Sequence, residues 1–308
     1  MKIIIDTDPG QDDAVAILLA LASPEFDVLG ITAVAGNVPL PLTSVNSLKM
    51  CELANRTEIA VFAGCDQPLE RELVTAEYVH GKSGIDGAAL SEPTMELQPG
   101  HAVDWIISTL ESSDGDITVC TLGPLTNIGA ALLKAPHIAE KVQQLVLMGG
   151  GFFEGGNTTP AAEFNIYVDP HAADIVFRSG IDLVMMPLDV THKALITAPR
   201  LEAFGAIGKP VGEAVGGMLD FYERFDLEKY GSEGGPLHDP TVIAYLLQPE
   251  LFSGRQCNVT VETQSELTMG MTVVDWWHVT ELPRNCMVMR DIDAAAFFEL
   301  VLERLARL

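Results

Sequence analysis

The stretch Lys2–Leu21, KIIIDTDPGQDDAVAILLAL, decides the fold. It opens with three consecutive isoleucines, the short β-branched run that is typical of a strand buried in a parallel sheet. Pro9 and Gly10 mark a turn after this run. The alanine- and leucine-rich run that follows predicts a buried helix. Acidic residues at its start agree with this, because the first turn of a helix has unpaired N–H groups with partial positive charge.

The turn itself holds four carboxylates within eight positions, those of Asp6, Asp8, Asp12 and Asp13. Close like charges repel and raise each other's pKa, and a bound cation removes that cost. An all-oxygen cluster suits a hard ion, Ca²⁺ or Mg²⁺, rather than zinc. Solvated acids that only cap the helix are the simpler alternative, and for Asp6 this turn-capping role is the one we expect.

Composition narrows the possible partners. The chain has 308 residues, 48% of them hydrophobic, and a net charge of −25 from 18 basic and 43 acidic residues. Such a charge argues against nucleic acid and anionic membranes as partners. We expect a cytoplasmic protein, because a strand begins right after Lys2 with no signal peptide, no apolar run reaches membrane-spanning length, and five scattered cysteines suggest reduced thiols.

Strands and helices alternate along the rest of the chain, which predicts an open, mostly parallel, doubly wound α/β sheet in a single domain, residues 1–308. Further strands are expected at 26–38, 59–64, 117–122, 145–151 and 182–188. Helices are expected at 42–53, 101–112, 169–180, 198–224, 240–247 and 294–308, with β-hairpins at 258–289. Two stretches break the alternation, and we expect mobile loops there, near 75–89 and 222–237.

Ligands in open parallel sheets bind beyond the carboxyl ends of the strands. The polar residues expected there, besides the four acids, are Asn37, Asn157, Glu163, Asn165, His238 and Asp239. Apart from His238, they are short amide and carboxylate groups, and no Lys or Arg is expected near them. Such a set suits a neutral polyol such as a sugar, whereas a phosphate would need cationic donors.

The motif DTDPGQDDAVAILLA resembles the signature of the inosine–uridine-preferring nucleoside hydrolases. Across the whole chain, further motifs match landmarks of that family in the same order: VAGNV, HGKSGIDG, LGPLTNI, LMGGG, NTTPAAEFNIYVDP, HDP and MTVVD. The resemblance implies an open α/β fold, a tightly held Ca²⁺, and hydrolysis of the N-glycosidic bond of ribonucleosides to ribose and free base. It further implies a role in nucleoside salvage or catabolism and assembly as a homodimer or homotetramer.

The resemblance also implies roles for individual residues. The calcium ligands would be Asp8, Asp13, Asp239 and the main-chain carbonyl of Leu122. The groups that hold the ribose hydroxyls would be Asp12, Asn157, Glu163 and Asn165. Asn37 would help position the attacking water, whose proton Asp8 accepts, and Met148 would pack against the sugar. His238 would protonate the leaving base, His80 would lie near the base, and either Tyr222 or Tyr230 would approach it.

The chemistry of N-glycosidic cleavage fits these residues, because a carboxylate-rich pocket stabilises an oxocarbenium-like sugar cation. Two other classes of protein remain open. An Asp-x-Asp after a first strand also occurs in Mg²⁺-dependent phosphatases with an aspartate nucleophile, although these need a basic residue for the phosphoryl group. A non-catalytic Ca²⁺-dependent nucleoside- or ribose-binding protein could keep the same cage, although His238 beside a full ligand set favours an enzyme.

Overall fold

The computed structural model describes residues 1–231 and 233–308, and of residues 226 and 228–230 it describes the backbone alone. An eight-stranded sheet forms its centre, in the order β3-β2-β1-β4-β5-β6-β10-β7. Its strands are β1 (Lys2–Thr7), β2 (Asp27–Ala33), β3 (Val61–Ala63), β4 (Ile117–Thr121), β5 (Val142–Met148), β6 (Leu183–Met186), β7 (Phe252–Cys257) and β10 (Cys286–Ile292). Only the β10–β7 pair in this sheet is antiparallel. The predicted open, mostly parallel α/β fold is confirmed.

Strand β1 lies in the middle of the sheet, paired in parallel with β2 on one side and β4 on the other. Its isoleucines are fully buried on both faces. Ile3 and Ile5 pack in one hydrophobic cluster and Ile4 packs in a second cluster, as the alternation of side chains along a strand requires. After β1 the chain runs outward through β2 and β3 and then returns to β4, so the strand order reverses beside β1. Ligand sites in this class of fold lie at such a reversal.

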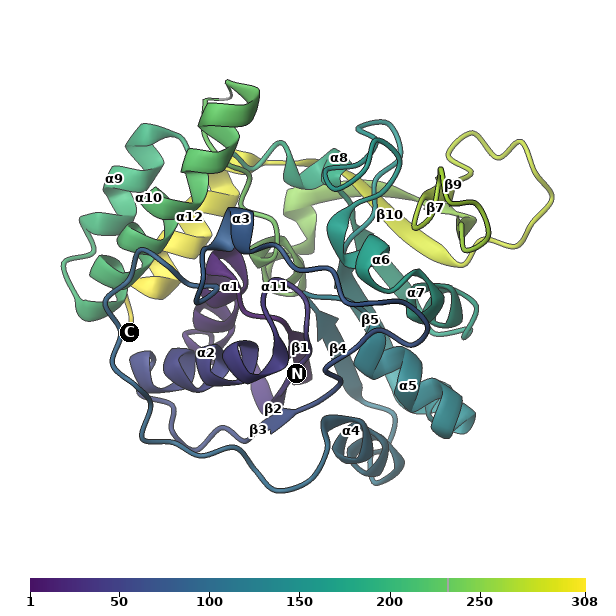
Figure 1. Cartoon of the computed structure of the whole chain (residues 1–308), viewed down its shortest axis with the longest axis horizontal. Helices are drawn as coiled ribbons and strands as arrows, with labels where there is room; N and C mark the ends of the chain where they lie inside the picture. The colour runs from purple at the N-terminus through teal and green to yellow at the C-terminus, as the bar shows by residue number, and fades with distance from the viewer. Residues whose placement is uncertain (232) are drawn as a thin grey trace.

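Helices cover both faces of the sheet (Figure 1). The helices are α1 (Gln11–Leu21), α2 (Leu40–Leu53), α3 (Glu77–His80), α4 (Ala102–Glu111), α5 (Thr126–Lys134), α6 (Phe164–Val168), α7 (Pro170–Phe177), α8 (Leu188–Thr191), α9 (Ala198–Gly205), α10 (Pro210–Tyr230), α11 (Pro240–Leu247) and α12 (Ala294–Leu305), with 3₁₀ turns at Pro136–Lys141 and Pro249–Leu251. Among the described residues, no helix combines the length and the apolar character needed to cross a bilayer.

The first helix is the centre of one of these layers. All eleven residues of α1 are buried, because the helix contacts α2, α10, α11 and α12 while its cluster also includes the isoleucines of β1. On the opposite face α4, α5 and α7 pack together (Figure 1). An apolar run that is buried all round needs no amphipathic stripe, which explains why the sequence after Asp13 contains almost only Ala, Val, Ile and Leu. This packing fixes the acidic turn relative to the sheet.

Three expectations about helices and loops need correction. Residues 222–230, expected as part of a loop, form the end of α10, because strong helix formers occur there together with the aromatic pair Phe221 and Phe225 at four-residue spacing. The single helix expected at 198–224 is two helices, α9 and α10. The chain breaks where Gly208 takes a positive φ of 68° and Pro210 starts the next helix. The long irregular stretch after β3 contains the one-turn helix α3.

The hairpins expected at 258–289 are only partly present. Strands β8 (Val259–Val261) and β9 (Thr272–Val274) form a separate antiparallel pair. Strand β10 instead enters the main sheet between β6 and β7. It pairs in parallel with β6 and antiparallel with β7, so it lies inside the sheet and is not one arm of a hairpin with β9.

Truncation of a leucine in α1 is expected to destabilise the protein strongly. Leu19 is fully buried, so Leu19→Ala removes buried apolar surface and leaves a cavity, at a cost of about 2–5 kcal/mol. The matched control is Leu267→Ala, because Leu267 is 86% exposed and its truncation should change the free energy of unfolding by no more than about 0.5 kcal/mol. Urea denaturation of both variants measures the difference. Equal midpoints would contradict the packing described for α1.

Candidate active site

A cavity of about 470 Å³ lies beyond the carboxyl ends of β1, β4 and β5. Its wall contains most of the residues predicted from the sequence: Asp12, Asn37, His80, Leu122, Met148, Asn157, Glu163, Asn165, His238 and Asp239. The other two, Asp8 and Asp13, lie behind this wall and are buried. Among the described residues, no Lys or Arg lines the cavity. The cavity is therefore acidic and suits a neutral, hydroxyl-rich ligand better than an anionic one.

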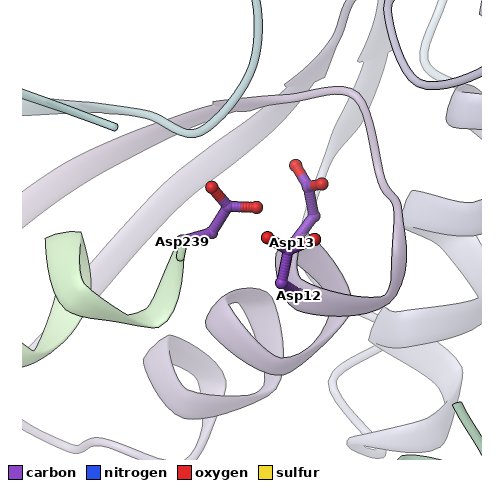
Figure 2. A group of neighbouring side chains, drawn as sticks. All are labelled: Asp12, Asp13 and Asp239. Carbon is purple, nitrogen blue, oxygen red and sulfur yellow. The ribbon is translucent and has the colours of Figure 1, made fainter. Parts of the chain in front are cut away.

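Three carboxylates from two distant parts of the chain converge at the inner end of the cavity. Asp12 and Asp13 lie in the first turn of α1, and Asp239 comes directly before α11 (Figure 2). One carboxylate oxygen from each lies within 4.8 Å of the other two. Asp239 occupies the N-cap position of α11, but its side chain makes no capping hydrogen bond. Its carboxylate points toward the other two instead (Figure 2), so helix capping does not explain this residue.

Asp13 ties the turn between β1 and α1 together. Its carboxylate accepts hydrogen bonds from Oγ1 of Thr7 (2.6 Å), from the main-chain N–H of Gly10 (2.9 Å) and from Nδ2 of Asn37 (3.1 Å). Asn37 also donates from Nδ2 to the carbonyl of Asp8 (3.1 Å). These contacts hold the first turn of α1 and the loop after β2 in one arrangement, so the position of each acid is set by its neighbours.

Asp8 fits between two glycines. A Cβ atom at Gly36 would lie 2.0 Å from Oδ2 of Asp8, and one at Gly123 would lie 2.1 Å from Oδ1. The main-chain N–H of Asn37 donates to Oδ2 (2.7 Å). No described residue donates a hydrogen bond to the buried Oδ1, nor to Oδ1 of Asp12. The expected carboxylate ligands were Asp8, Asp13 and Asp239. The group of three contains Asp12, which was expected to bind the sugar, in place of Asp8.

Burial dominates the electrostatics of these acids. It raises the pKa of Asp8 and of Asp239 well above the usual range, and the charge of the neighbouring aspartates adds to the shift. The pKa of Asp12 rises to about 8 for the same two reasons, with Asp13 the main neighbour. Ionised carboxylates this close together in an apolar environment are costly. A positive charge among them would remove most of that cost.

Asp6 belongs to a different network. Its Oδ1 accepts hydrogen bonds from the side chains of Thr32 and Asn127. Burial raises its pKa to about 7, against the effect of these two hydrogen bonds. Asp6 therefore links β1 to β2 and α5, below the cavity, and is not part of the group of three acids.

The wall on the side of β5 is formed by Glu163 and Asn165. Glu163 caps α6, and its carboxylate accepts the main-chain N–H groups of Gly150 (2.9 Å), Asn165 (2.9 Å) and Ile166 (3.2 Å). Burial nevertheless raises its pKa to about 7. Asn165 donates from Nδ2 to the carbonyl of Leu122 (2.7 Å). This expected metal-ligand carbonyl is thus at the cavity wall, within a hydrogen bond of Asn165.

Met148 and Asn157 complete this wall. The carbonyl of Met148 accepts a hydrogen bond from Nδ2 of Asn165 (3.2 Å), and its sulfur lies 3.6 Å from the same atom. Oδ1 of Asn157 accepts from the main-chain N–H of Phe164 (3.0 Å). Both side chains line the cavity, so one apolar and several polar groups face the same space.

Two histidines lie on the other side of the cavity. Nδ1 of His80 contacts Oε1 of Gln11 (2.7 Å), and burial lowers the pKa of His80 to about 4. Nδ1 of His238 contacts Oγ1 of Thr191 (2.7 Å). Burial, together with the nearby His192 and His80, lowers the pKa of His238 well below its usual range. The His80 ring, with a pKa of about 4, is therefore neutral near pH 7.

The structure adds residues that the sequence did not single out. Gln11 is fully buried and donates from Nε2 to the carbonyls of His80 (3.0 Å) and Asp86 (3.2 Å), so it anchors the segment around α3. His192 and Glu154 line the cavity, with Nδ1 and Oε2 3.4 Å apart. For Gln11 the sequence offered one signal, its place among acids at the start of a buried helix. A polar side chain that is buried there needs hydrogen-bond partners.

Of the two tyrosines expected near the base, Tyr222 is buried in α10 and lines the cavity. Its ring centroid lies 5.6 Å from that of His80. The side chain of Tyr230 lies outside the described residues.

Filling the space beside Asp8 is expected to disrupt the site. Gly36→Ala places a Cβ against the buried carboxylate of Asp8, so either that side chain or the loop after β2 must move, which should lower the free energy of unfolding by about 1–3 kcal/mol. Gly205→Ala is the control, because a Cβ there meets nothing within 4 Å and the change should stay within about 1 kcal/mol. Urea denaturation measures both. A Gly36→Ala variant as stable as the control would refute the close fit.

Comparison with known proteins agrees with this geometry. The family model described as inosine-uridine preferring nucleoside hydrolase matches residues 3–299. The chain is 54% identical over 309 residues to an uncharacterized protein of Schizosaccharomyces pombe, covering 100% of both chains. It is 50% identical over 306 residues to the pyrimidine-specific ribonucleoside hydrolase RihA of Escherichia coli, covering 99% of this chain and 98% of RihA.

A solved structure shares the whole architecture. The purine-preferring ribonucleoside hydrolase from Gardnerella vaginalis superposes with a TM-score of 0.93 at 32% identity, over 99% of this chain and 98% of that one. The acidic cavity, the sheet and these similarities together show that the chain is a hydrolase of the inosine–uridine-preferring nucleoside hydrolase family.

Proposed function

We propose that this enzyme is a Ca²⁺-dependent ribonucleoside N-ribohydrolase that releases ribose and free base, with a preference for pyrimidine nucleosides. The observation that carries the proposal is the convergence of Asp12, Asp13 and Asp239 at a cavity that no described Lys or Arg lines. As the family resemblance implies, the enzyme would act in nucleoside salvage or catabolism in the cytoplasm, as a homodimer or homotetramer.

The donor set fits calcium. It consists of carboxylate and carbonyl oxygens, which are the ligands of a hard divalent ion. The buried Oδ1 atoms of Asp8 and Asp12 have no hydrogen-bond donor among the described residues, so they are available as ligands. Asp8, Asp13, Asp239 and the carbonyl of Leu122 would hold the ion, with Asp12 close by. When bound, the ion would supply electrostatic activation of water and of the sugar hydroxyls.

The residues around this centre divide the remaining chemistry. Asp8 would accept a proton from the attacking water. Asp12, Glu163, Asn165 and Asn157 would hold the ribose hydroxyls. The sugar ring flattens as the reaction approaches its transition state. Hydrogen bonds to the ribose hydroxyls that become stronger at that point lower the activation barrier. The surrounding carboxylates favour the positive charge that develops on the sugar as the bond to the base weakens.

The base would leave from the histidine side of the cavity. His238 would donate a proton to the departing base, a transfer that typically contributes about 10²–10⁴-fold to the rate. His80 and Tyr222, whose rings lie 5.6 Å apart by their centroids, would contact the base. The preference for pyrimidines is supported by similarity: RihA, named as pyrimidine-specific, is 50% identical to this chain, whereas the purine-preferring Gardnerella enzyme is 32% identical.

An assay of four nucleosides tests the proposal. Calcium-replete protein is expected to release reducing sugar from uridine and cytidine at least about tenfold faster than from inosine and adenosine, which is within the discrimination a pocket can provide. EDTA should abolish the release and added calcium should restore it. His238→Ala should lower turnover of uridine by about 10²-fold or more while binding of ribose is kept.

Each rival function has its own outcome in this assay. A protein that releases no ribose from any of the four nucleosides is not a nucleosidase. Hydrolysis of a phosphomonoester with nucleosides inert would indicate the phosphatase. Binding of ribose with no turnover would indicate the binding protein. If EDTA left turnover unchanged, the proposed role of calcium would be wrong, but the nucleosidase function would stand.

Calcium is expected to stabilise the protein in a pH-dependent way. In the metal-free protein Asp12, with a pKa of about 8, and Asp6 and Glu163, at about 7, hold protons that the unfolded chain releases near pH 4. The folded state therefore binds more protons across this window, and its stability falls as the pH rises toward 8. Calcium needs deprotonated ligands, so it should raise the Tm more at about pH 8 than at about pH 6.5.

Thermal unfolding with EDTA and with excess calcium at both pH values measures this effect. Asp239→Asn should remove most of the calcium-dependent rise in Tm. Asp291→Asn is the control, because Asp291 is an exposed acid paired with Lys193 and should leave the rise intact. A Tm that calcium does not change at either pH would contradict the proposed metal site.

A further inference from the structure

Helix α8 places Thr191 directly beside His238. Oγ1 of Thr191 lies 2.7 Å from Nδ1 of His238, although the two residues are 47 positions apart in the chain. Thr191 is fully buried. Hydroxyl side chains in helices often bond the carbonyl one turn earlier, whereas here the hydroxyl reaches across to the cavity wall.

The backbone of α8 holds this hydroxyl in place independently of His238. The main-chain N–H of Thr191 donates to the carbonyl of Pro187 (3.1 Å), and that of Leu188 donates to the carbonyl of Gly150 (2.9 Å). The carboxylate of Asp189 accepts the main-chain N–H groups of Phe152 (2.9 Å) and Phe153 (2.8 Å). The helix is thus fixed to the loop after β5 at several points, and the Thr191 hydroxyl is not needed to hold it there.

The two ring nitrogens of His238 differ in their surroundings. Nδ1 faces Thr191, whereas Nε2 has no hydrogen-bond partner among the described residues, and the ring lines the cavity. In the described part of the chain, Nδ1 is also the only hydrogen-bond partner of the Thr191 hydroxyl. A buried hydroxyl loses free energy if its single proton has no acceptor. With a neutral ring it therefore donates to Nδ1, and the ring proton is on Nε2.

The same oxygen serves the doubly protonated ring as well, because it can then accept the Nδ1–H. In both forms a proton on Nε2 is available to a ligand. Because the hydroxyl is fixed by α8, it also sets the rotation of the ring about its side chain. Such a partner behind a catalytic imidazole controls both the tautomer and the direction of the other nitrogen.

We propose that Thr191 is a positioning residue for the leaving-group step, because its hydroxyl holds His238 with Nε2–H toward the departing base. This inference rests on the function proposed above. In that step the bond between C1′ and the base nitrogen breaks, its electron pair moves to the base, and the base takes the Nε2 proton of the doubly protonated ring. The ring is left neutral, with its remaining proton on Nδ1 donated to the Thr191 oxygen. The oxygen of the attacking water forms the new bond to C1′, and the water's proton goes to Asp8.

Three variants of the calcium-replete enzyme test the inference on two substrates. Thr191→Val removes the hydroxyl at nearly constant shape, and Thr191→Ser restores it. Thr43→Val removes a buried hydroxyl outside the cavity, one that bonds the carbonyl of Leu40 (3.1 Å). Uridine has a leaving group that needs a proton, whereas p-nitrophenyl riboside releases a stable anion that does not.

We expect Thr191→Val to lower kcat on uridine about 10- to 100-fold, with KM changed no more than about threefold, since it loses part of what the proton donor contributes. On p-nitrophenyl riboside its kcat should stay within about threefold of wild type. Thr191→Ser should recover most of the uridine activity, and Thr43→Val should match wild type on both substrates. The ¹⁵N spectrum of the His238 ring should show an acceptor Nδ1 in the wild type and mixed tautomers in Thr191→Val.

Other outcomes overturn the inference. Equal losses on both substrates would indicate a purely structural role, and no loss on uridine would show that the hydroxyl is dispensable. An unchanged ¹⁵N pattern in Thr191→Val would show that another group sets the tautomer. If the wild type hydrolyses no nucleoside, the proposed function fails, and the ¹⁵N comparison still decides the role of Thr191.

Discussion

The constraint that the site must satisfy is the repulsion among buried carboxylates at the end of β1. Asp8, Asp12 and Asp13 are brought together by one turn, and Asp239 joins them from the start of α11. Isolated charges in such surroundings are among the most costly groups a protein can bury. The fold tolerates them because neighbours satisfy part of their hydrogen-bonding capacity and because their raised pKa values let them keep protons. The cation proposed for this site would lower the same cost. Stability and function are thus opposed at this one place.

The support for these acids comes from small and amide-bearing residues rather than from opposite charge. Gly36 and Gly123 make room for the Asp8 carboxylate, and Asn37 bonds to both Asp8 and Asp13. A lysine or arginine in their place would neutralise the acids permanently. Neutral donors hold the carboxylates in position and leave their charge available to a ligand, as a preorganised site requires.

The sequence predicted the parts of this protein that rest on local pattern. The isoleucines of β1 predicted a strand buried in a parallel sheet. The acids after them, together with His238 and Asp239, were expected beyond the carboxyl ends of the strands, and the structure has them at or behind the wall of one cavity. Local pattern failed where tertiary packing decides. Residues 222–230 extend α10 because helix-forming residues there act together with the packing of Tyr222 and Phe225. Strand β10 enters the main sheet between β6 and β7 where a hairpin was expected. Thr191 lies outside the quoted motifs, and Gln11 lies inside the first motif without a role that the sequence assigned. The roles of both residues follow only from the distant side chains that the fold brings to them.

The first turn of α1 contacts two different parts of the cavity, which restricts the insertions and deletions that this turn can accept. Gln11 holds the segment of α3 on one side, while the next two residues face the acidic centre on the other. An inserted or deleted residue there would rotate the helix start by about 100° and would misplace both walls of the cavity at once. Length and spacing in this turn should therefore stay constant among homologues even where the chemistry of the base-binding wall has diverged.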